Sequence, residues 1–414
     1  MMATLKLSAR NLMRYHRRTW LTAGLITIGV VAMLLFVSAA GSFKQVMIGQ
    51  ITDSLLGHLQ VHRKGYVASV DNLPLNLNVG AKMIERVKTE LKAEPDIAAV
   101  SIRLKLGAMF SNFSETTSIR LNGIDPAAED AAAPGLLTRI IDGGREGSLV
   151  GPGQILIPDL IAKGMKVKVG DTVVLVATNR DGSVNGKNFS VRGVLEPVTG
   201  PGGRDGYVHE DDARELLRME ETEAMEIAVR LHDLAKLDKV EASLAERLEK
   251  LTNKDGKPVL ELHSWKALSP FANIAGMIDL MTLFIRIMLV AIVLVSVMNV
   301  MLMAVYERIR EIGTLAAIGT PPRRILGLYV GEGLLLGLIG AAVGVAVSLA
   351  VVALLNIYPL QFPFGRQIIT LAPTLSVTEV VTVAVLVVGM AVLASLQPAW
   401  RASRMDPIQA LRHV

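Results

Sequence analysis

The chain has 414 residues, 51% of them apolar, and a mean hydropathy of +0.43, which together exclude an ordinary soluble protein. It contains no cysteine, so disulfides, thiol catalysis and cysteine-based metal sites are excluded as well. The formal net charge is only +5, and the basic residues cluster beside apolar runs. This distribution is typical of a membrane protein whose basic flanks set its orientation, and it argues against nucleic-acid binding.

The N-terminal region predicts a first membrane span. Basic residues are frequent in the segment 1–18, and a run without any charged residue follows at 19–43. A helix of this length can cross an apolar layer of about 30 Å. A cleaved signal peptide is the alternative, because Val37-Ser38-Ala39 is an acceptable cleavage site. The run is longer than the apolar part of most signal peptides, so we expect an uncleaved span.

Residues 44–272 carry mixed charge and turn residues, and they predict a large soluble domain. Two separated β/α patterns, in 44–140 and 224–272, predict an α/β part that the chain leaves and re-enters. Between them, 141–223 predicts a β-rich insertion, with its most flexible loop at 200–206. The alanine-rich stretch 127–135 is expected to be a surface loop.

Two histidines in this domain raise the question of a metal site. The stretch 57–62 alternates with period two, which places His58, Gln60 and His62 on one face of a strand. Paired histidines are common zinc ligands, but no third ligand is placed by spacing. We therefore expect the two histidines to be structural.

Three further spans are predicted at 273–306, 325–357 and 380–399, with a short loop at 358–379 and a basic tail at 400–414. Arg286 is expected at the outer, wet end of the second span, either reaching water or paired with another helix. The third span holds small residues at spacing four, which allow close helix packing. These packing residues are Gly333, Gly337, Gly340 and Gly344.

Glu332 is a carboxylate inside the third span. Such a residue suggests a proton or ion relay, or else a structural or inter-subunit hydrogen bond. No cationic residue embedded in the membrane lies near it in sequence. We favour the structural interpretation.

The segment 307–324 joins the second and third spans and is unlike an ordinary loop. Ile309, Ile312, Leu315 or Ala316, and Gly319 recur at helical spacing, so the charged residues before Gly313 lie mostly off the apolar face. Gly319 followed by Thr320-Pro321-Pro322 predicts a helix stop. Because basic residues flank this segment and both termini, all three are expected in the cytoplasm, with the soluble domain outside the inner membrane.

The same segment resembles the cytoplasmic hinge of ABC transporter permeases of the MacB, LolC/LolE and FtsX superfamily. It reads E-R-x-R-E-I-G-x-L-x-A-I-G and is followed by Arg323-Arg324. Two more stretches resemble this superfamily: GHLQVHRKGY after the first span, and P-A-x-x-A-x-x-x-D-P-x-x-A-L at the C-terminus. An ordinary basic loop is the alternative for the hinge alone.

The resemblance implies a fold of four transmembrane α-helices plus a large extracytoplasmic α/β domain, with a porter-like part and a β-rich inserted subdomain. It also implies that the hinge is a coupling helix that docks on an ATPase, as in the mechanotransmission (type VII) transporters. The residues it assigns to this coupling are Glu307, Arg308, Arg310, Glu311, Gly313, Ala317, Gly319, Arg323 and Arg324.

No motif for ATP hydrolysis occurs in the chain. A phosphate-binding loop needs GxxxxGK[ST], and the nearest string, Asn185-Gly186-Lys187-Asn188, lacks the Ser or Thr and the first glycine. We therefore expect no enzyme activity and no bound cofactor or metal, with ATP and Mg²⁺ held by a separate ATPase. The resemblance implies two ATPase copies and a second permease copy or paralogue around a two-fold axis, within a lipid membrane.

The expected function is that of a permease subunit that extracts or exports lipoprotein, lipid or another amphiphile, with a periplasmic carrier, adaptor or lipoprotein as a further partner. Efflux of small molecules or peptides is one alternative. Activation of a periplasmic hydrolase without transport, as in FtsX-like proteins, is another. The cargo, the direction of transport and the choice between homodimer and heterodimer stay open.

Overall fold

The computed structural model describes residues 2–144, 147–196, 205–253, 256–364 and 367–412. It divides into two compact units, one formed by Met1–Val46 with Ala275–Val414 and the other by Met47–Ile274. The two units are described in turn. Most of the predicted loop at 200–206 falls outside the described residues.

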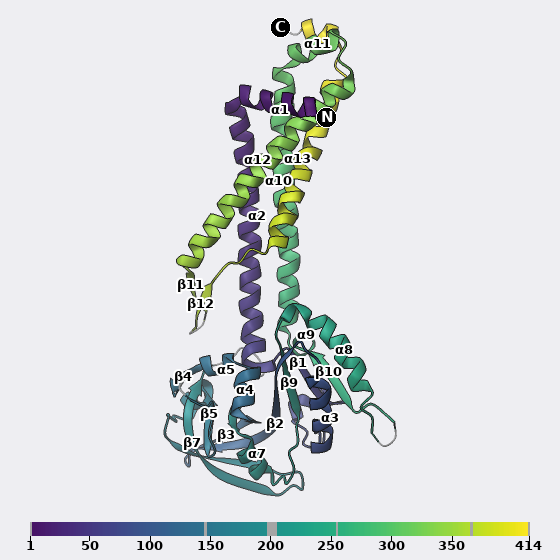
Figure 1. The fold of residues 1–414 in the computed structure, drawn as a ribbon. Helices are drawn as coiled ribbons and strands as arrows, with labels where there is room; N and C mark the ends of the chain where they lie inside the picture. Colours follow the sequence, from purple (N-terminus) through teal and green to yellow (C-terminus); the bar gives the residue numbers. More distant parts are fainter. Residues whose placement is uncertain (1, 145–146, 197–204, 254–255, 365–366, 413–414) are drawn as a thin grey trace. The chain divides into compact units, whose positions relative to one another are not determined.

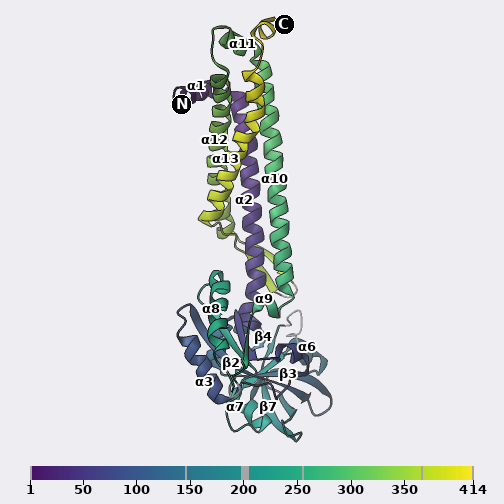
Figure 2. The same ribbon diagram turned by 90° about the vertical axis from the view of Figure 1, so that its right-hand side faces the viewer.

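The first unit is helical (Figures 1 and 2). Four of the described helices are long and apolar enough to cross a membrane, as the four charge-poor runs predict. The elements are α1 (Met2–Arg14), α2 (His16–Ile51), α10 (Phe271–Glu307), α11 (Ile309–Ala317), α12 (Pro322–Ile357), β11 (Leu360–Phe364), β12 (Gln367–Leu371), α13 (Val377–Ser403) and α14 (Pro407–Arg412).

The N-terminal helix α1 is separate from α2 and packs against α12. Figure 1 shows α1 lying across one end of the helices rather than along them. The Ser8 hydroxyl donates to the carbonyl oxygen of Leu328 at 2.9 Å, where Gly331 leaves room for the serine side chain. The segment predicted as a cytoplasmic N-terminus is therefore an ordered part of the helical unit.

The four glycines of α12 lie at two helix contacts. A Cβ on Gly333 or Gly337 would meet Ala391 of α13, whereas one on Gly340 or Gly344 would meet α2. Gly333 and Gly337 therefore allow α13 to pack closely on α12, and Gly340 and Gly344 allow α2 to do so, because glycine has no side chain at the contact.

Glycines of α12 at these contacts are expected to be intolerant of a methyl group. In Gly340→Ala the new Cβ would lie 2.6 Å from Ile26 Cγ2 and 3.2 Å from the carbonyl oxygen of Ala23. Such overpacking costs about 1–3 kcal/mol, so the thermal unfolding midpoint of the detergent-solubilised chain should fall. Gly327→Ala is the matched control, because nothing lies within 4 Å of its Cβ. Equal midpoints for the two variants would contradict close packing at Gly340.

The second unit is built on a mixed sheet of ten strands with helices packed on it. Its strands are β1 (Leu59–Arg63), β2 (Ile97–Ser111), β3 (Thr116–Ile124), β4 (Ile140–Gly143), β5 (Gln154–Pro158), β6 (Thr172–Thr178), β7 (Val184–Leu195), β8 (Asp205–His209), β9 (Glu226–Leu231) and β10 (Leu260–Ser264). Its helices are η1 (Thr52–Leu56), η2 (Val67–Asn72), α3 (Ala81–Lys92), α4 (Pro126–Ala132), α5 (Gly135–Thr138), α6 (Asp159–Gly164), α7 (Glu210–Leu217), η4 (Leu234–Lys236), α8 (Leu237–Glu249) and α9 (Trp265–Leu268).

The strand order explains why the chain leaves and re-enters the α/β part. Strands β9 and β10, from the second β/α pattern, pair with β1 and β2 from the first. The strands between them do not form a separate sheet. Strands β2, β3, β8, β5, β7 and β6 pair in a closed ring, whose apolar side chains, among them Phe110, Leu175 and Phe189, form a hydrophobic core. The β-rich insertion is thus continuous with the rest through β2 and β3.

The alanine-rich stretch 127–135 was predicted wrongly as a surface loop. It forms α4 and the start of α5, and Ala132, Ala133 and Glu129 are fully buried. The Asp125 carboxylate accepts from the backbone N–H of Ala127, and Pro126 occupies the first helical position, so the helix start is well signalled. The alanine-rich composition led to the prediction of a loop, although Asp125 and Pro126 are typical of a helix start.

Candidate functional site

The hinge between α10 and α12 is a short helix closed by a left-handed glycine. Helix α11 ends at Ala317, Gly319 has φ +91°, and α12 begins at Pro322. The N–H of Thr320 bonds to the carbonyl of Leu315, and that of Gly319 to the carbonyl of Ala316. This pattern closes the helix end where the Gly-Thr-Pro-Pro string predicts a stop.

One face of α11 is buried and the other is exposed. Ile309, Ile312 and Gly313 are buried, in a segment that packs against α14. The sequence left open whether Leu315 or Ala316 lies on the apolar face. Leu315 is 40% exposed, so Ala316, which is partly buried, is the residue on that face. Ile318 is 77% exposed. The exposed coupling candidates are Glu307, Arg310, Glu311, Ala317, Gly319, Arg323 and Arg324.

Arg308 does not lie on the charged face where the sequence placed it. Its side chain is only 6% exposed, and its guanidinium lies 3.9 Å from the ring centroid of Tyr15. Arg308 Nη1 also donates to Glu332 Oε1 at 3.2 Å. A residue buried in this way within one chain is poorly placed to touch a partner, and the same holds for Gly313.

Glu332 therefore has the cationic partner that sequence spacing did not reveal. Besides Arg308, Asn11 of α1 donates to Glu332 Oε1 at 3.0 Å, and the side chain of Glu332 is 2% exposed. The hydroxyl of Tyr15, whose ring stacks against the Arg308 guanidinium, donates to Glu311 Oε1 at 3.2 Å. The network ties the N-terminal helix, the hinge and α12 together, which fits a structural role.

Arg286 has a different environment. It is partly exposed on α10, and its Nε has no hydrogen-bond partner among the described residues. Asp279, which lies earlier on the same helix, forms an ion pair with Lys44 of α2, with Lys44 Nζ 2.6 Å from Asp279 Oδ2. Asp279 and Arg286 are seven residues apart, about 10 Å along a helix axis, which is too far for a direct ion pair.

Removing the Glu332 charge is expected to destabilise the chain. In Glu332→Gln the buried Arg308 loses its counter-charge, which costs about 3–5 kcal/mol, and the thermal unfolding midpoint should fall. The double variant Arg308→Met/Glu332→Met should recover most of the loss, because well-packed apolar side chains can replace a buried ion pair. Glu307→Gln, at an exposed carboxylate, is the control. Wild-type stability of Glu332→Gln alone would refute the structural role.

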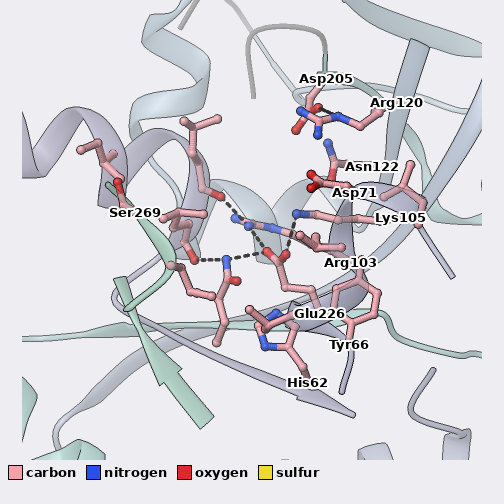
Figure 3. A pocket seen from close by; sticks show the side chains of 18 of the residues that line it. His62, Tyr66, Asp71, Arg103, Lys105, Arg120, Asn122, Asp205, Glu226 and Ser269 are labelled. Carbon is pink, nitrogen blue, oxygen red and sulfur yellow. Dashed lines mark hydrogen bonds and ion pairs between the residues drawn. The ribbon is translucent and has the colours of Figure 1, made fainter. Parts of the chain in front are cut away.

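The second unit contains a buried charge cluster centred on Arg103 of β2 (Figure 3). Arg103 Nη2 bonds to Glu129 Oε1 at 2.7 Å and Nη1 to Glu226 Oε1 at 2.5 Å. Nη1 also donates to the carbonyl oxygen of Leu55, in the π-helical turn that continues α2. All three charged side chains are at most 2% exposed. The cluster fastens the end of α2 to the centre of the sheet.

Glu226 is held ionised by its neighbours. Burial alone would raise the pKa of Glu226, but Lys105 and Arg103 outweigh it and lower that pKa to about 2. Lys105 Nζ lies 2.6 Å from Glu226 Oε2, and Gln60 Nε2 donates to Oε1 at 2.7 Å. Every oxygen of this buried carboxylate is thereby satisfied.

A cavity of about 240 Å³ lies beside this cluster, within the second unit. Its walls come from the end of α2 with η1, from β1, η2, β2, β3, β8 and β9, and from residues 267–271. Figure 3 shows Glu226, Tyr66 and His62 on one side and Arg120, Asp205 and Asn122 on another, with Lys105 between them. Sequence reasoning found neither the cluster nor the cavity. The available signal was the presence of charged residues such as Arg103 within strand-like apolar patterns.

The two histidines of the first strand lie in separate environments. His58 Nδ1 accepts the backbone N–H of Leu231 at 3.0 Å, which supports a structural role. His62 stacks on Tyr66 with ring centroids 5.3 Å apart and is 2% exposed. Among the described residues no group of His, Asp and Glu has the arrangement of a metal site.

His62 should make the second unit less stable in acid. Burial lowers the pKa of His62 to about 4, so unfolding takes up a proton between about pH 6.5 and that value. Stability from this group is complete above pH 6.5 and falls by up to about 3 kcal/mol as the pH drops through the window. Unfolding is followed by the fluorescence of buried Trp265, with exposed Trp20 and Trp400 replaced by Phe.

The variant His62→Gln should flatten this pH dependence between pH 6.5 and 4. His232→Gln, at an exposed histidine of the same unit, is the control and should leave it unchanged. An identical pH profile in His62→Gln and the parent chain would show that His62 is not the group responsible.

The fold and these sites define a class: a four-span membrane protein with a mixed α/β domain between its first two spans and a charged helical hinge between the second and third. The model of the MacB-like periplasmic core domain matches residues 19–247, and that of the FtsX-like permease C-terminal domain matches 283–407. The chain belongs to the MacB, LolC and FtsX superfamily of ABC transporter permeases.

Individual relatives agree with this assignment. The lipoprotein-releasing system transmembrane protein LolC of Xylella fastidiosa (strain Temecula1) is 26% identical over 283 residues, which cover 63% of this chain and 66% of LolC. The macrolide export ATP-binding/permease protein MacB of Syntrophobacter fumaroxidans is 34% identical over 119 residues, which cover 29% of this chain and 15% of MacB. The chain therefore matches about two thirds of the LolC protein and a small part of the MacB protein.

Among solved structures, the extracellular domain of the ABC-type transporter YknZ from Gram-positive bacteria is 15% identical, with a TM-score of 0.33. The match covers 50% of this chain and 98% of that domain. At this score the likeness supports no further argument.

Proposed function

We propose that the chain is the permease subunit of an ABC transporter and that it docks through α11 on a separate ATPase. The observation that carries this proposal is the exposed face of the hinge. Leu315 and Ile318 are exposed there, and so are the charged residues Arg310, Glu311 and Arg323. Protein interfaces commonly combine exposed apolar residues with charged ones.

The relatives support the ATPase, and the distribution of basic residues supports the orientation. MacB is named as an ATP-binding and permease protein, so a permease of this superfamily works with ATP binding in the same machine. Basic residues flank α1, the hinge and α14, and by the positive-inside rule this charge distribution favours a cytoplasmic position for them. The second unit then lies in the periplasm, and the membrane is the bacterial inner membrane.

The proposed mechanism transmits force instead of opening a channel. Closure of two ATPase copies would push on α11, and α10 would carry the motion because only Arg308 separates the two helices. Helix α2 would carry it as well, through the bond between the Leu55 carbonyl and Arg103. A second permease copy or paralogue completes the pair.

The proposed cargo is a lipoprotein, lipid or other amphiphile taken from the inner membrane. Four spans leave little room for a water-filled path, and the LolC relative is named for lipoprotein release. Efflux of a small molecule or peptide is the second candidate. It is favoured by the match of the MacB-like periplasmic core domain, which takes in more than half of this chain.

Charge reversal on α11 should uncouple the permease from its ATPase without unfolding it. Arg310→Glu/Glu311→Arg keeps the net charge and changes exposed side chains, so abundance should stay near normal. Stimulation of ATP hydrolysis and co-purification of the ATPase should fall about tenfold or more, since like charges are penalised at an interface. Ile318→Ser and Gly319→Val should act in the same direction, the latter because a β-branched residue is strained at φ +91°.

Two controls separate docking from local structure. Tyr15→Phe removes the hydrogen bond to Glu311 and leaves the charges, so it should couple normally. Glu85→Lys/Lys88→Glu reverses an exposed ion pair of α3 in the other unit and should also couple normally. If the α11 variants bind and stimulate the ATPase as the wild type does, the hinge is an ordinary basic loop and the docking proposal fails.

A further inference from the structure

The cavity of the second unit combines an apolar wall with a polar one. Leu55, Val67, Val70, Leu73 and Phe271 form the apolar part. They come from η1, from η2 and the residue after it, and from the start of α10, so the apolar wall is assembled from segments far apart in the chain. Clefts lined in this way by apolar side chains with a few polar groups are typical of small-molecule sites.

Every cation of the polar wall is paired with a carboxylate. Arg103 pairs with Glu129 and Glu226, Lys105 with Glu226, and Arg120 with Asp205 at 2.7 Å. The three lining cations are thus balanced by Glu129, Glu226 and Asp205, and the exposed Asp71 adds a fourth carboxylate. His62 adds no charge near pH 7, because burial lowers its pKa to about 4.

Two buried polar atoms on this wall have no partner. The Tyr66 hydroxyl and His62 Nδ1 make no hydrogen bond among the described residues, although the two side chains are 1% and 2% exposed. A buried polar group without a partner is costly, so a group that could bond to it would be favoured there. Both residues line the cavity, next to Glu226 in Figure 3.

We propose that this cavity binds an uncharged amphiphile, with an aliphatic chain against Leu55, Val70 and Phe271 and a neutral hydrogen-bonding head toward Tyr66 and His62. An anionic head would find every lining cation already neutralised, and burying a charge without a counter-charge is strongly unfavourable. The volume of about 240 Å³ lies below the range of roughly 300–1,000 Å³ for drug-sized ligands. The occupant is accordingly a single short chain and not a whole two-chain lipid.

This inference goes beyond the proposed function, because it assigns a site to one chain and needs neither ATP nor an ATPase. Failure of the docking proposal would leave it standing, and the reverse also holds. The occupant would contact both the end of α2 and the start of α10, since Ile51 and Phe271 line the same cavity.

The test is photolabelling of the full-length chain in lipid nanodiscs, without nucleotide. The probe is a monodecanoylglycerol that carries a diazirine in its chain, compared with decanoic acid and decylamine that carry the same group. The glycerol probe should label peptides containing residues 67–73 and 267–271, and unlabelled monodecanoylglycerol should compete. Each charged probe should label these peptides about tenfold less. Equal labelling by either charged probe, or labelling confined to the membrane spans, would overturn the proposal.

Two variants sharpen the result. Ala267→Trp adds bulk at an exposed position that lines the cavity and should reduce labelling of residues 67–73 about fivefold or more. Ala242→Trp, at an exposed position of α8 that does not line the cavity, is the matched control. Labelling that is unchanged in Ala267→Trp would contradict the site.

Tyr66→Phe removes only the unpartnered hydroxyl. Half-saturation by the glycerol probe should require about three- to tenfold more probe, whereas the thermal unfolding midpoint should stay the same or rise. A lower midpoint would mean that the hydroxyl is bonded within the chain, which removes the argument. Unchanged half-saturation would show that the hydroxyl does not meet the head group.

Discussion

The contact on which the α/β domain depends is the guanidinium of Arg103. It stands on β2 opposite Glu226 of β9, and it also bonds to Glu129 of α4 and to the Leu55 carbonyl. One side chain thereby joins two strands, a helix and the end of α2. Burial disfavours its charge, but the two carboxylates outweigh this effect and raise the pKa of Arg103. A group that cannot lose its proton is suited to a permanent junction.

The helical unit has a comparable junction at Glu332. There the carboxylate is the buried centre, and Arg308 and Asn11 supply the donors. Because Asn11 lies on α1, the N-terminal helix belongs to the same assembly as the hinge. This arrangement keeps Arg308 away from solvent and leaves the neighbouring Arg310 and Glu311 on the outer face. Within residues 307–311, Arg308 and Ile309 are therefore buried inside the unit, whereas Glu307, Arg310 and Glu311 are exposed to solvent.

The sequence predicted the parts of the fold that local patterns determine. Apolar runs predicted four spans, the alternating pattern at 57–62 predicted strand β1, and Gly319-Thr320-Pro321-Pro322 predicted the end of α11 and the start of α12. The sequence did not predict the two buried charge networks, because their members are remote from one another in the chain. Arg103 meets Glu129 and Glu226 across 26 and 123 residues, and Glu332 meets Asn11 across 321. Helical periodicity depends only on residues within one or two turns of the same helix. It therefore assigned Arg308 to the charged, exposed face, although its side chain is buried.

The length of β2 has a mechanical consequence. Arg103 lies within this strand of 15 residues, which pairs with β9 over its first half, with β6 near its end, and with β3 from Arg103 onward. A pull on the end of α2 would therefore enter this strand at Arg103, where β2 pairs with both β9 and β3. Backbone hydrogen bonds to both neighbouring strands would share the load. Strand β2 would behave as a stiff bar, and the ring of strands that it closes would move as one body.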